Sequence, residues 1–251
     1  MKKQLEEFKS VTIFILATNE TCSLKQTVSE IQNLSCVDDI EKLVIVLKNE
    51  NCLSCDTAKQ IAAMYEFKKP KVEIYLQKAK NIEGCVAELP CLVKSSHFII
   101  MGADMEMNPE SVKDFISRAK QHPDRIICAS KWHRESTVKG YGKFHEIATR
   151  AMNTFVSLLF GTKVADPFSI YQIYPISVYR KMKFENSLRP GYEYTLKPLR
   201  CGIEYEEIPT IYRKSKERKS NFNFFHLVVL ALTFCATAIR LRLTPLNKLL
   251  K

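Results

Sequence analysis

Five short apolar runs rich in β-branched residues recur along the first half of the chain, and this repetition constrains the fold more than any other feature. Each run is apolar at consecutive positions, which is typical of a strand that is covered on both faces of a parallel sheet. We therefore expect five buried parallel strands. They cover residues 11–18, 43–47, 72–76, 97–101 and 125–130.

Segments with helical spacing of apolar residues separate these runs. Leu24, Val28 and Ile31 form the first such pattern. Because strand and helix alternate, we expect an α/β domain with a mostly parallel sheet flanked by helices. Two more strand-like pieces follow at 171–176 and 203–212.

A longer helix is predicted over residues 139–160. Its expected apolar side contains Ile147, Met152, Phe155, Val156 and Leu159.

The net charge of +11 is a surplus of cations that favours an anionic partner such as phosphate or a lipid headgroup. A nucleic-acid partner is not expected, because the cations gather beside an apolar segment and do not alternate with exposed aromatic residues. Nine cysteines lack framework spacing and no apolar leader precedes residue 11, so we expect reduced thiols in the cytosol. Cys52 and Cys55 form a C-x-x-C motif, but the further ligands of a zinc site are not evident.

The C-terminal part changes character twice. Residues 213–219 carry five cations and one acid, and residues 224–239 are almost entirely apolar. At 1.5 Å per residue this run is about 24 Å long, shorter than the roughly 30 Å core of a bilayer. Its polar residues fall on one helical stripe, which is typical of a helix in the membrane interface or in an oligomer. A helix docked on the sheet is the alternative. The stripe contains His226, Thr233, Thr237, Arg240 and Thr244.

Polar loops follow three of the predicted strands, at the edge where parallel sheets bind ligands. The loop after the fourth strand contains Asp104 and Glu106, whose spacing directs both carboxylates the same way if the loop is extended. Two such oxygen ligands suit Mg²⁺ or Mn²⁺, which complete their shells with water and phosphate. Alternatively, both acids complement the dipole of the helix that begins near Pro109. The residues alone leave both interpretations open.

The order of four motifs resembles that of the family 2 glycosyltransferases with the GT-A fold. The motifs are "TNE" at 18–20, "GAD" at 102–104 followed by an acid and "PE", "DPFSIYQIYP" at 166–175, and "EIPTIYR" at 207–213 ahead of a basic segment. Within that family the chain is most similar to the dolichol- or polyprenyl-phosphate mannosyltransferase-like branch, over roughly residues 11–222.

This resemblance implies a Rossmann-like GT-A domain over residues 11–222, after an N-terminal extension (1–10) and before an apolar or amphipathic membrane-associating helix and tail (223–251). It also implies a hexosyltransferase that takes a GDP- or UDP-sugar donor with Mg²⁺ or Mn²⁺. Asp104 and Glu106 would hold the metal, and Asp104 and Asp166 are the catalytic candidates. The residues implied for donor binding are Thr18, Asn19, Glu20, Lys48, Glu50, Asn81, Gly102, Ala103 and Asp104.

The chain departs from the family pattern at three places. Gly102 stands where relatives have the first aspartate of the metal loop, and residues 48–51 replace an Asp-Asp-Gly-Ser element. Residues 169–172 replace Ser-Gly-Phe-Arg. These departures support an alternative, in which a catalytically impaired GT-A-like module binds a nucleotide-sugar or a partner protein without turnover.

The implied acceptor is a polyprenyl phosphate or a related molecule at the cytoplasmic face of the membrane. Such a phosphate is already an anion at neutral pH and needs cations, whereas a sugar hydroxyl needs a carboxylate base. We expect a cytoplasmic protein, peripheral to the inner face of the membrane, with a homo-oligomer through the C-terminal helix as a further option. Glu193 is expected to be an exposed helix acid. The candidate cations for the acceptor phosphate are Lys131, Arg134, Lys139, Arg213, Lys214, Lys216 and Lys219.

Overall fold

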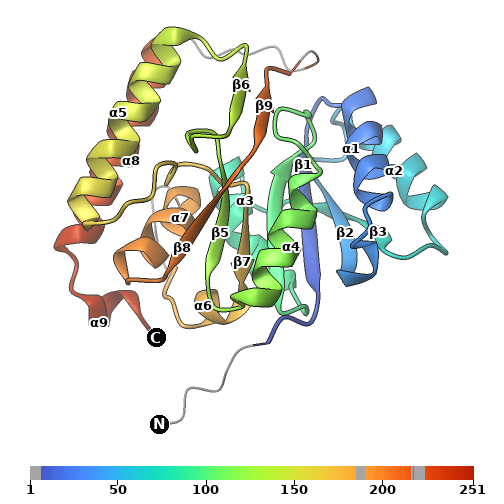
Figure 1. Cartoon of the computed structure of the whole chain (residues 1–251). Coiled ribbons are helices and arrows are strands. Elements are labelled where there is room, and N and C mark those ends of the chain that lie inside the picture. Colours follow the sequence, from blue (N-terminus) through green and yellow to red (C-terminus); the bar gives the residue numbers. More distant parts are fainter. Residues whose placement is uncertain (1–6, 185–189, 216, 218–223) are drawn as a thin grey trace.

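A seven-stranded sheet forms the centre of the computed structural model, which describes residues 7–184, 190–215, 217 and 224–251 (Figure 1). The strand order is β3-β2-β1-β4-β7-β5-β8, and β7 is antiparallel to both of its neighbours. All other pairs in this sheet are parallel. The strands are β1 (Val11–Ala17), β2 (Ile40–Leu47), β3 (Lys71–Leu76), β4 (His97–Gly102), β5 (Ile126–Ser130), β7 (Gln172–Pro175) and β8 (Tyr205–Pro209).

The five predicted parallel strands are therefore confirmed as β1 to β5. The single strand predicted over 203–212 is wrong in one respect, because it divides at Pro209 into β8 and β9 (Ile211–Arg213). Proline has no backbone N–H for a further ladder bond, so the chain leaves the large sheet there. β9 pairs in parallel with β6 (Thr137–Lys139) in a small second sheet.

Helices cover both faces of the large sheet (Figure 1). Alternate residues of β1 point to opposite faces, so Ile13 and Ile15 pack under α1, α2 and α4, whereas Phe14 packs with α3, α6 and α7. The helices are α1 (Cys22–Gln32), α2 (Cys55–Met64), α3 (Ile82–Glu88), α4 (Ser111–Gln121), α5 (Lys143–Phe160), α6 (Ile176–Arg180), α7 (Pro190–Arg200), α8 (Phe224–Leu243) and α9 (Leu246–Leu249).

The long helix α5 begins at Lys143, later than predicted, because β6 uses residues 137–139. Its predicted apolar side is partly wrong: Met152 and Val156 are buried, but Ile147 is 68% and Phe155 41% exposed. The buried face instead includes polar Thr149, Asn153 and Ser157. These side chains find partners inside the domain; the Asn153 amide, for example, donates to Asp166. Burial thus follows the hydrogen-bond partners as well as hydrophobicity.

The apolar C-terminal segment forms α8, which packs against α5 and α7 in a third apolar cluster (Figure 1). Phe234 is fully buried there, with its ring edge-on to Phe168 and Tyr192. The docked helix that was the alternative is thus present, but it lies on other helices and not on the sheet. Within the part of the chain that the structure describes, no helix is both long and apolar enough to cross a bilayer.

The predicted polar stripe of α8 contacts α7 through one residue, and its threonine hydroxyls form hydrogen bonds with the backbone of α8 itself. Arg240 forms an ion pair with Glu193 of α7. The hydroxyls of Thr233 and Thr237 donate to carbonyls one turn earlier, as does Thr244. The side chain of His226 and the predicted boundary at 222 lie outside the described residues.

Glu193 was expected to be exposed, and this expectation is wrong. It is 2% exposed, and its carboxylate accepts from Lys197 at 2.7 Å. A charge in this position is stable only because it is paired on α7 and across to α8. Glu193 therefore fastens the C-terminal helix to the domain.

Candidate functional site

The carboxyl ends of β1, β4, β5 and β8 lie at one edge of the sheet, since these strands are mutually parallel. The loops after β1, β2 and β4, and the small β6–β9 sheet, gather at this edge. In open α/β sheets this is where ligands bind. It is the candidate site.

The acidic loop after β4 is held against β1 and then turns sharply. The Ala103 amide donates to the Leu16 carbonyl at 3.0 Å, which extends the β1–β4 register by one residue. Met105 has a φ of 57°, in the left-handed region that non-glycine residues rarely adopt. The loop is therefore not extended, and the expectation that both acids point the same way for that reason is wrong. Such local strain is typical of functional sites.

Asp104 and Glu106 are both tied into this turn. Asp104 is 8% exposed, and its Oδ1 accepts from the Glu106 amide at 3.2 Å. The Glu106 carbonyl accepts from the Arg213 amide at 2.8 Å, and its Oε1 accepts from the Ser215 amide at 3.3 Å. The acidic loop is thereby joined to the end of β9.

Gly102 leaves room for the Asp104 carboxylate. A Cβ at position 102 would lie 3.0 Å from Asp104 Oδ1 and 3.4 Å from its Cγ. The side chain of Asp104 therefore folds back over the backbone of Gly102. An aspartate at 102, as in the family pattern, requires Asp104 to shift.

The loop after β1 is braced by its own acid. Glu20 is buried, and its Oε2 accepts from the amides of Thr18 and Asn19 at 2.7 and 2.9 Å. The Thr18 carbonyl in turn accepts from the Ser54 amide at 3.4 Å, which connects this loop to the one after β2. In this conformation Glu20 shapes the loop and leaves Thr18 and Asn19 at its surface.

The remaining donor-binding candidates divide into exposed and structural residues. Lys48 and Glu50 are exposed in the loop after β2. Asn81 is the N-cap of α3, and its Oδ1 accepts from the Gly84 amide at 2.8 Å. This contact explains Asn81 by helix capping alone.

Three of the predicted cations come together in the β6–β9 sheet. Lys139 and Arg213 are register partners, and the Lys214 amide donates to the Lys139 carbonyl at 3.0 Å. All three residues are exposed. Since Arg213 also binds the Glu106 backbone, this basic sheet lies directly beside the acidic loop. Lys216 and Lys219 lie outside the described residues.

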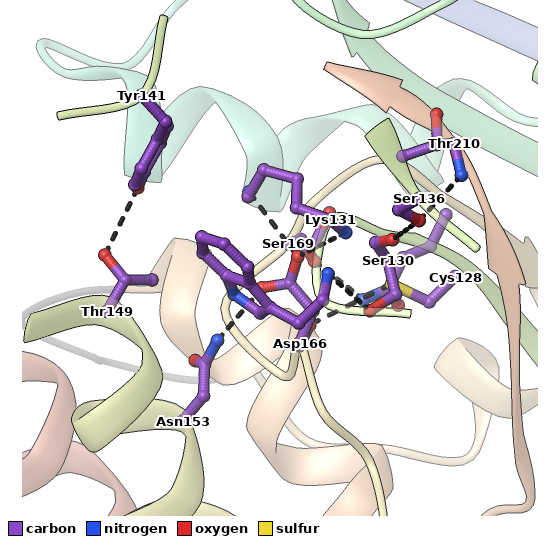
Figure 2. A network of polar contacts seen from close by, with 12 residues as sticks. Cys128, Ser130, Lys131, Ser136, Tyr141, Thr149, Asn153, Asp166, Ser169 and Thr210 are labelled. Atoms are coloured by element: carbon purple, nitrogen blue, oxygen red, sulfur yellow. Dashed lines mark hydrogen bonds and ion pairs between the residues drawn. The ribbon is translucent and has the colours of Figure 1, made fainter. Parts of the chain in front are cut away.

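The other two cations are placed differently. Arg134 is 87% exposed and pairs with its neighbour Glu135 at 3.3 Å. Lys131 instead turns inward, and its Nζ lies 3.5 Å from Asp166 Oδ2 (Figure 2). Burial by itself would lower the pKa of Lys131, but the Asp166 carboxylate together with Tyr141 and Cys128 outweighs burial and holds that pKa above its ordinary value.

Asp166 is the centre of a buried polar network (Figure 2). It is fully buried; Oδ1 accepts from Asn153 Nδ2 at 3.1 Å, and Oδ2 accepts from the Lys131 amide at 3.2 Å. Its own amide donates to Glu207 at 2.9 Å. Both carboxylate oxygens of Asp166 are thus engaged with groups of the protein itself. In this conformation Asp166 and Lys131 are paired with each other, so Asp166 as a catalytic residue and Lys131 as a ligand of the acceptor phosphate stay predictions.

Sequence reasoning missed Asn153 and Glu207. The available signal was the spacing of Thr149, Asn153 and Ser157, polar residues four apart on the same helical face as Met152 and Val156. Polar residues on an otherwise apolar face indicate partners inside the protein. Nothing local, however, marks Glu207 as the partner of Asp166.

Glu217 was also missed, and it caps α1. Its carboxylate accepts from the amides of Thr21 and Cys22 at 3.0 Å, and from the Ser23 hydroxyl at 2.7 Å. Burial alone would raise the pKa of Glu217, but the hydrogen bonds from residues 21–23 outweigh it and lower that pKa. Glu217 thereby connects the basic segment after β9 to the start of α1, next to the loop that contains Glu20.

The acidic loop fits a metal only in part. Among the residues that the structure describes, no group of three or more His, Cys, Asp or Glu side chains is arranged to hold an ion. Asp104 and Glu106 supply two carboxylates on one turn, which is the number that Mg²⁺ or Mn²⁺ takes when phosphate and water complete its shell. The donor set thus suits a cation that arrives with a diphosphate.

The fold is the GT-A fold of nucleotide-sugar glycosyltransferases, as expected. It is similar to that of glucosyl-3-phosphoglycerate synthase from Mycobacterium tuberculosis. In complex with Mn²⁺, UDP and phosphoglyceric acid, that structure matches 94% of this chain and 80% of its own, at a TM-score of 0.65 and 12% identity. The match to its complex with Mn²⁺, UDP-glucose and phosphoglyceric acid covers 94% of this chain and 81% of that chain, at a TM-score of 0.67 and 11% identity. No protein-family model matches the chain.

Proposed function

We propose that this protein transfers a sugar from a nucleotide-diphosphate sugar, with the donor bound at the carboxyl edge of the sheet. The single observation that carries the proposal is the contact between the acidic loop and the basic β6–β9 sheet, on a GT-A fold. Asp104 and Glu106 would hold Mg²⁺ or Mn²⁺ on the donor diphosphate. The neighbour's complexes with Mn²⁺ and UDP-glucose support this choice of ligands.

The bound cation would neutralise the charge that develops on the departing diphosphate. The chain's own residues supply the rest. Thr18 and Asn19 present the loop that Glu20 braces, and this loop would lie against the nucleotide. Preorganised groups of this kind lower the barrier because they need no rearrangement as charge forms.

Binding of UDP and of GDP, each with and without Mn²⁺, tests the proposal by calorimetry on the full chain. We expect one nucleotide to bind and its affinity to depend on Mn²⁺, and Asp104→Asn to remove the Mn²⁺ dependence. Asp38→Asn is a matched control, since Asp38 is exposed at the opposite edge, before β2. Failure of both nucleotides to bind would refute the donor assignment.

For the acceptor we propose a polyprenyl phosphate or a related lipid phosphate. Lys139, Arg213 and Lys214 would bind its phosphate, which needs cations and no base. The burial of Asp166 agrees with an acceptor that needs no carboxylate base. Replacing these three cations by glutamine should abolish transfer to a lipid phosphate and leave nucleotide binding within twofold. Loss of both would contradict the division into donor and acceptor sides.

We further propose that the protein lies on the cytoplasmic surface of an anionic membrane. Both α5 and α8 carry an apolar stripe on the side opposite their buried residues, so both stripes face away from the domain. Two exposed cations, Arg242 at the end of α8 and Lys248 in α9, fit anionic headgroups and would repel a second copy of this basic chain. The exposed stripe residues are Phe144, Ile147, Phe155, Leu158, Val229, Leu232, Ile239 and Leu243.

Flotation with vesicles that contain anionic or only zwitterionic lipid tests this surface. We expect binding to anionic vesicles, and Leu232→Asp with Leu243→Asp to abolish it, since each buried leucine is worth about 1.5–3 kcal/mol. Phe67→Asp is the control, because Phe67 is 95% exposed beyond the end of α2. Dimerisation of the unchanged chain without vesicle binding would favour an oligomer through α8 instead.

One set of contacts favours a second candidate, a module that binds a nucleotide-sugar or a partner protein without turnover. The carboxylates of Glu20 and Glu106 accept hydrogen bonds from backbone amides, and Gly102 provides no third carboxylate. Hydrolysis of UDP-glucose and GDP-mannose by the purified chain separates the two candidates. Tight nucleotide binding without release of free nucleotide would support the second.

A further inference from the structure

The loop after β2 brings two thiols together beside the proposed donor site. Cys52 Sγ and Cys55 Sγ are 2.7 Å apart, and the Cys55 amide donates to the Cys52 carbonyl at 3.0 Å. This turn places the two side chains on one side. A disulfide has an S–S length of about 2.05 Å, so less than about 1 Å of sulfur movement would form it.

We propose that Cys52 and Cys55 are a redox-active dithiol that forms a disulfide by exchange with a low-molecular-weight disulfide. Cys55 is the first residue of α2 and Cys52 lies three residues before it, and a C-x-x-C pair at the start of a helix is typical of thiol–disulfide chemistry. The two thiols also differ in access: Cys52 is half-buried and Cys55 is buried. Cys52 is thus the thiol that meets the external disulfide, and Cys55 is the resolving thiol.

The exchange proceeds in two balanced steps. The Cys52 thiolate attacks glutathione disulfide, which forms a mixed disulfide at Cys52 and releases one glutathione thiolate that takes up a proton. Cys55 then loses its proton and attacks Cys52 Sγ, which releases the second glutathione. The protein loses two hydrogens, and one glutathione disulfide is reduced to two glutathione thiols.

The surroundings of the pair set its rate. Burial, with the contact to Cys55, raises the pKa of Cys52, so the attacking thiolate is scarce at neutral pH. Oxidation should therefore accelerate as the pH rises.

The state of the dithiol also affects the loop around it. In the reduced form the Cys55 thiol donates to the Asn49 carbonyl at 3.0 Å, and the Ser54 amide between the thiols donates to Thr18. A disulfide removes the thiol hydrogen and with it the bond to Asn49. Asn49 lies between Lys48 and Glu50, which are candidates for donor binding. Oxidation should therefore change the affinity for nucleotide, a consequence that rests on the proposed function.

The test begins with the reduced full-length chain in glutathione buffers of graded ratio, followed by trapping of free thiols and mass analysis. Cys52 and Cys55 fall on one tryptic peptide, between Lys48 and Lys59. We expect this peptide to lose two hydrogens under conditions in which exposed Cys91 carries only glutathione. A peptide that stays reduced, or that carries glutathione without closing, would overturn the proposal.

Single variants separate the two roles. Cys55→Ser should trap glutathione on Cys52, whereas Cys52→Ser should leave Cys55 unmodified. Cys91→Ser is the control and should not change closure. Equal glutathione addition at Cys52 and Cys55 in these variants would contradict the assignment of roles.

Nucleotide binding is then measured for the reduced and the oxidised chain. We expect at least a threefold difference in affinity. Equal affinities would refute the coupling. If neither state binds nucleotide, the donor assignment fails while the dithiol stands on its mass change. If the disulfide does not form, nucleotide binding still tests the donor site by itself.

Discussion

The acidic loop after β4 and the Asp166 loop before β7 each bring an aspartate to the same edge of the sheet, but they differ in how that aspartate is used. Asp166 is fully buried and has partners from three parts of the chain, namely Lys131, Asn153 and Glu207. Asp104 is also buried, at 8% exposed, but it belongs to a strained turn in the loop that follows β4. A carboxylate whose oxygens are both engaged in the interior holds other groups in place, whereas a carboxylate in a loop at the carboxyl edge of the sheet lies where ligands of such sheets bind.

The largest effect that tests this comparison is expected from Asp166→Ala. It leaves Lys131, whose side chain is only 13% exposed, without its carboxylate, and breaking such a buried pair costs about 3–5 kcal/mol. The free energy of unfolding in urea measures this loss. Asp104→Ala is the matched change in the other loop and should cost clearly less.

A double variant gives the control for this prediction. Asp166→Asn with Lys131→Met removes both charges, and we expect it to recover much of the stability that Asp166→Ala loses. If Asp166→Ala unfolds like the unchanged chain but loses sugar transfer, Asp166 is a functional acid and the comparison is wrong.

The next largest effect is expected from Glu217→Gln, which weakens the cap on α1. No side chain within α1 or at Thr21 caps this helix, and its first turn contains no acid. We expect a loss of about 1 kcal/mol in the free energy of unfolding. Glu206→Gln, a change to a glutamate that pairs at the surface with Arg118, should cost less.

The pH dependence of this difference follows from the direction of the pKa shift. The pKa of folded Glu217 lies below its ordinary value of 4.5. Its ionic contribution is therefore fully present above about pH 4.5 and is lost as the pH falls through the lower pKa of the folded protein. The free energy of unfolding is measured for the unchanged chain and for Glu217→Gln, at pH 7 and at acid pH. The difference between the two chains should become smaller only at acid pH. A constant difference would mean that the carboxylate charge plays no part.

The strands and their order along the chain were accessible from sequence, whereas the partners of the site residues were not. The short runs at 11–18 and 97–101 are apolar at nearly every position and rich in β-branched residues, and this local pattern is enough to predict buried strands. Asp166 and Lys131 are 35 positions apart, and Glu217 is 196 from Thr21. Such pairs depend on how helices and loops pack in space, which no local pattern encodes. Short strands such as β6, with three residues and an exposed face, also lack a signal.

A pair of substitutions at Gly102 sharpens the question of the missing acid. Gly102→Ala places a Cβ about 3.0 Å from Asp104 Oδ1 and should weaken Mn²⁺-dependent nucleotide binding several-fold. Gly102→Asp adds the same crowding but also a third carboxylate, so its Mn²⁺ affinity should exceed that of Gly102→Ala. Titration with Mn²⁺ at fixed nucleotide measures both. Equal affinities for the two variants would mean that a carboxylate at 102 does not reach the ion.

The smallest effect is expected from Arg134→Ala. Arg134 is 87% exposed and forms an ion pair with exposed Glu135, and surface pairs of this kind contribute about 0–1 kcal/mol. Unfolding in urea should therefore be almost unchanged. Transfer to a lipid phosphate should also survive, because the cations beside the acidic loop are Lys139, Arg213 and Lys214. If Arg134→Ala abolishes transfer while stability and nucleotide binding persist, the acceptor phosphate binds nearer β5 than the basic sheet, and the accessible side of the site extends toward Asp166.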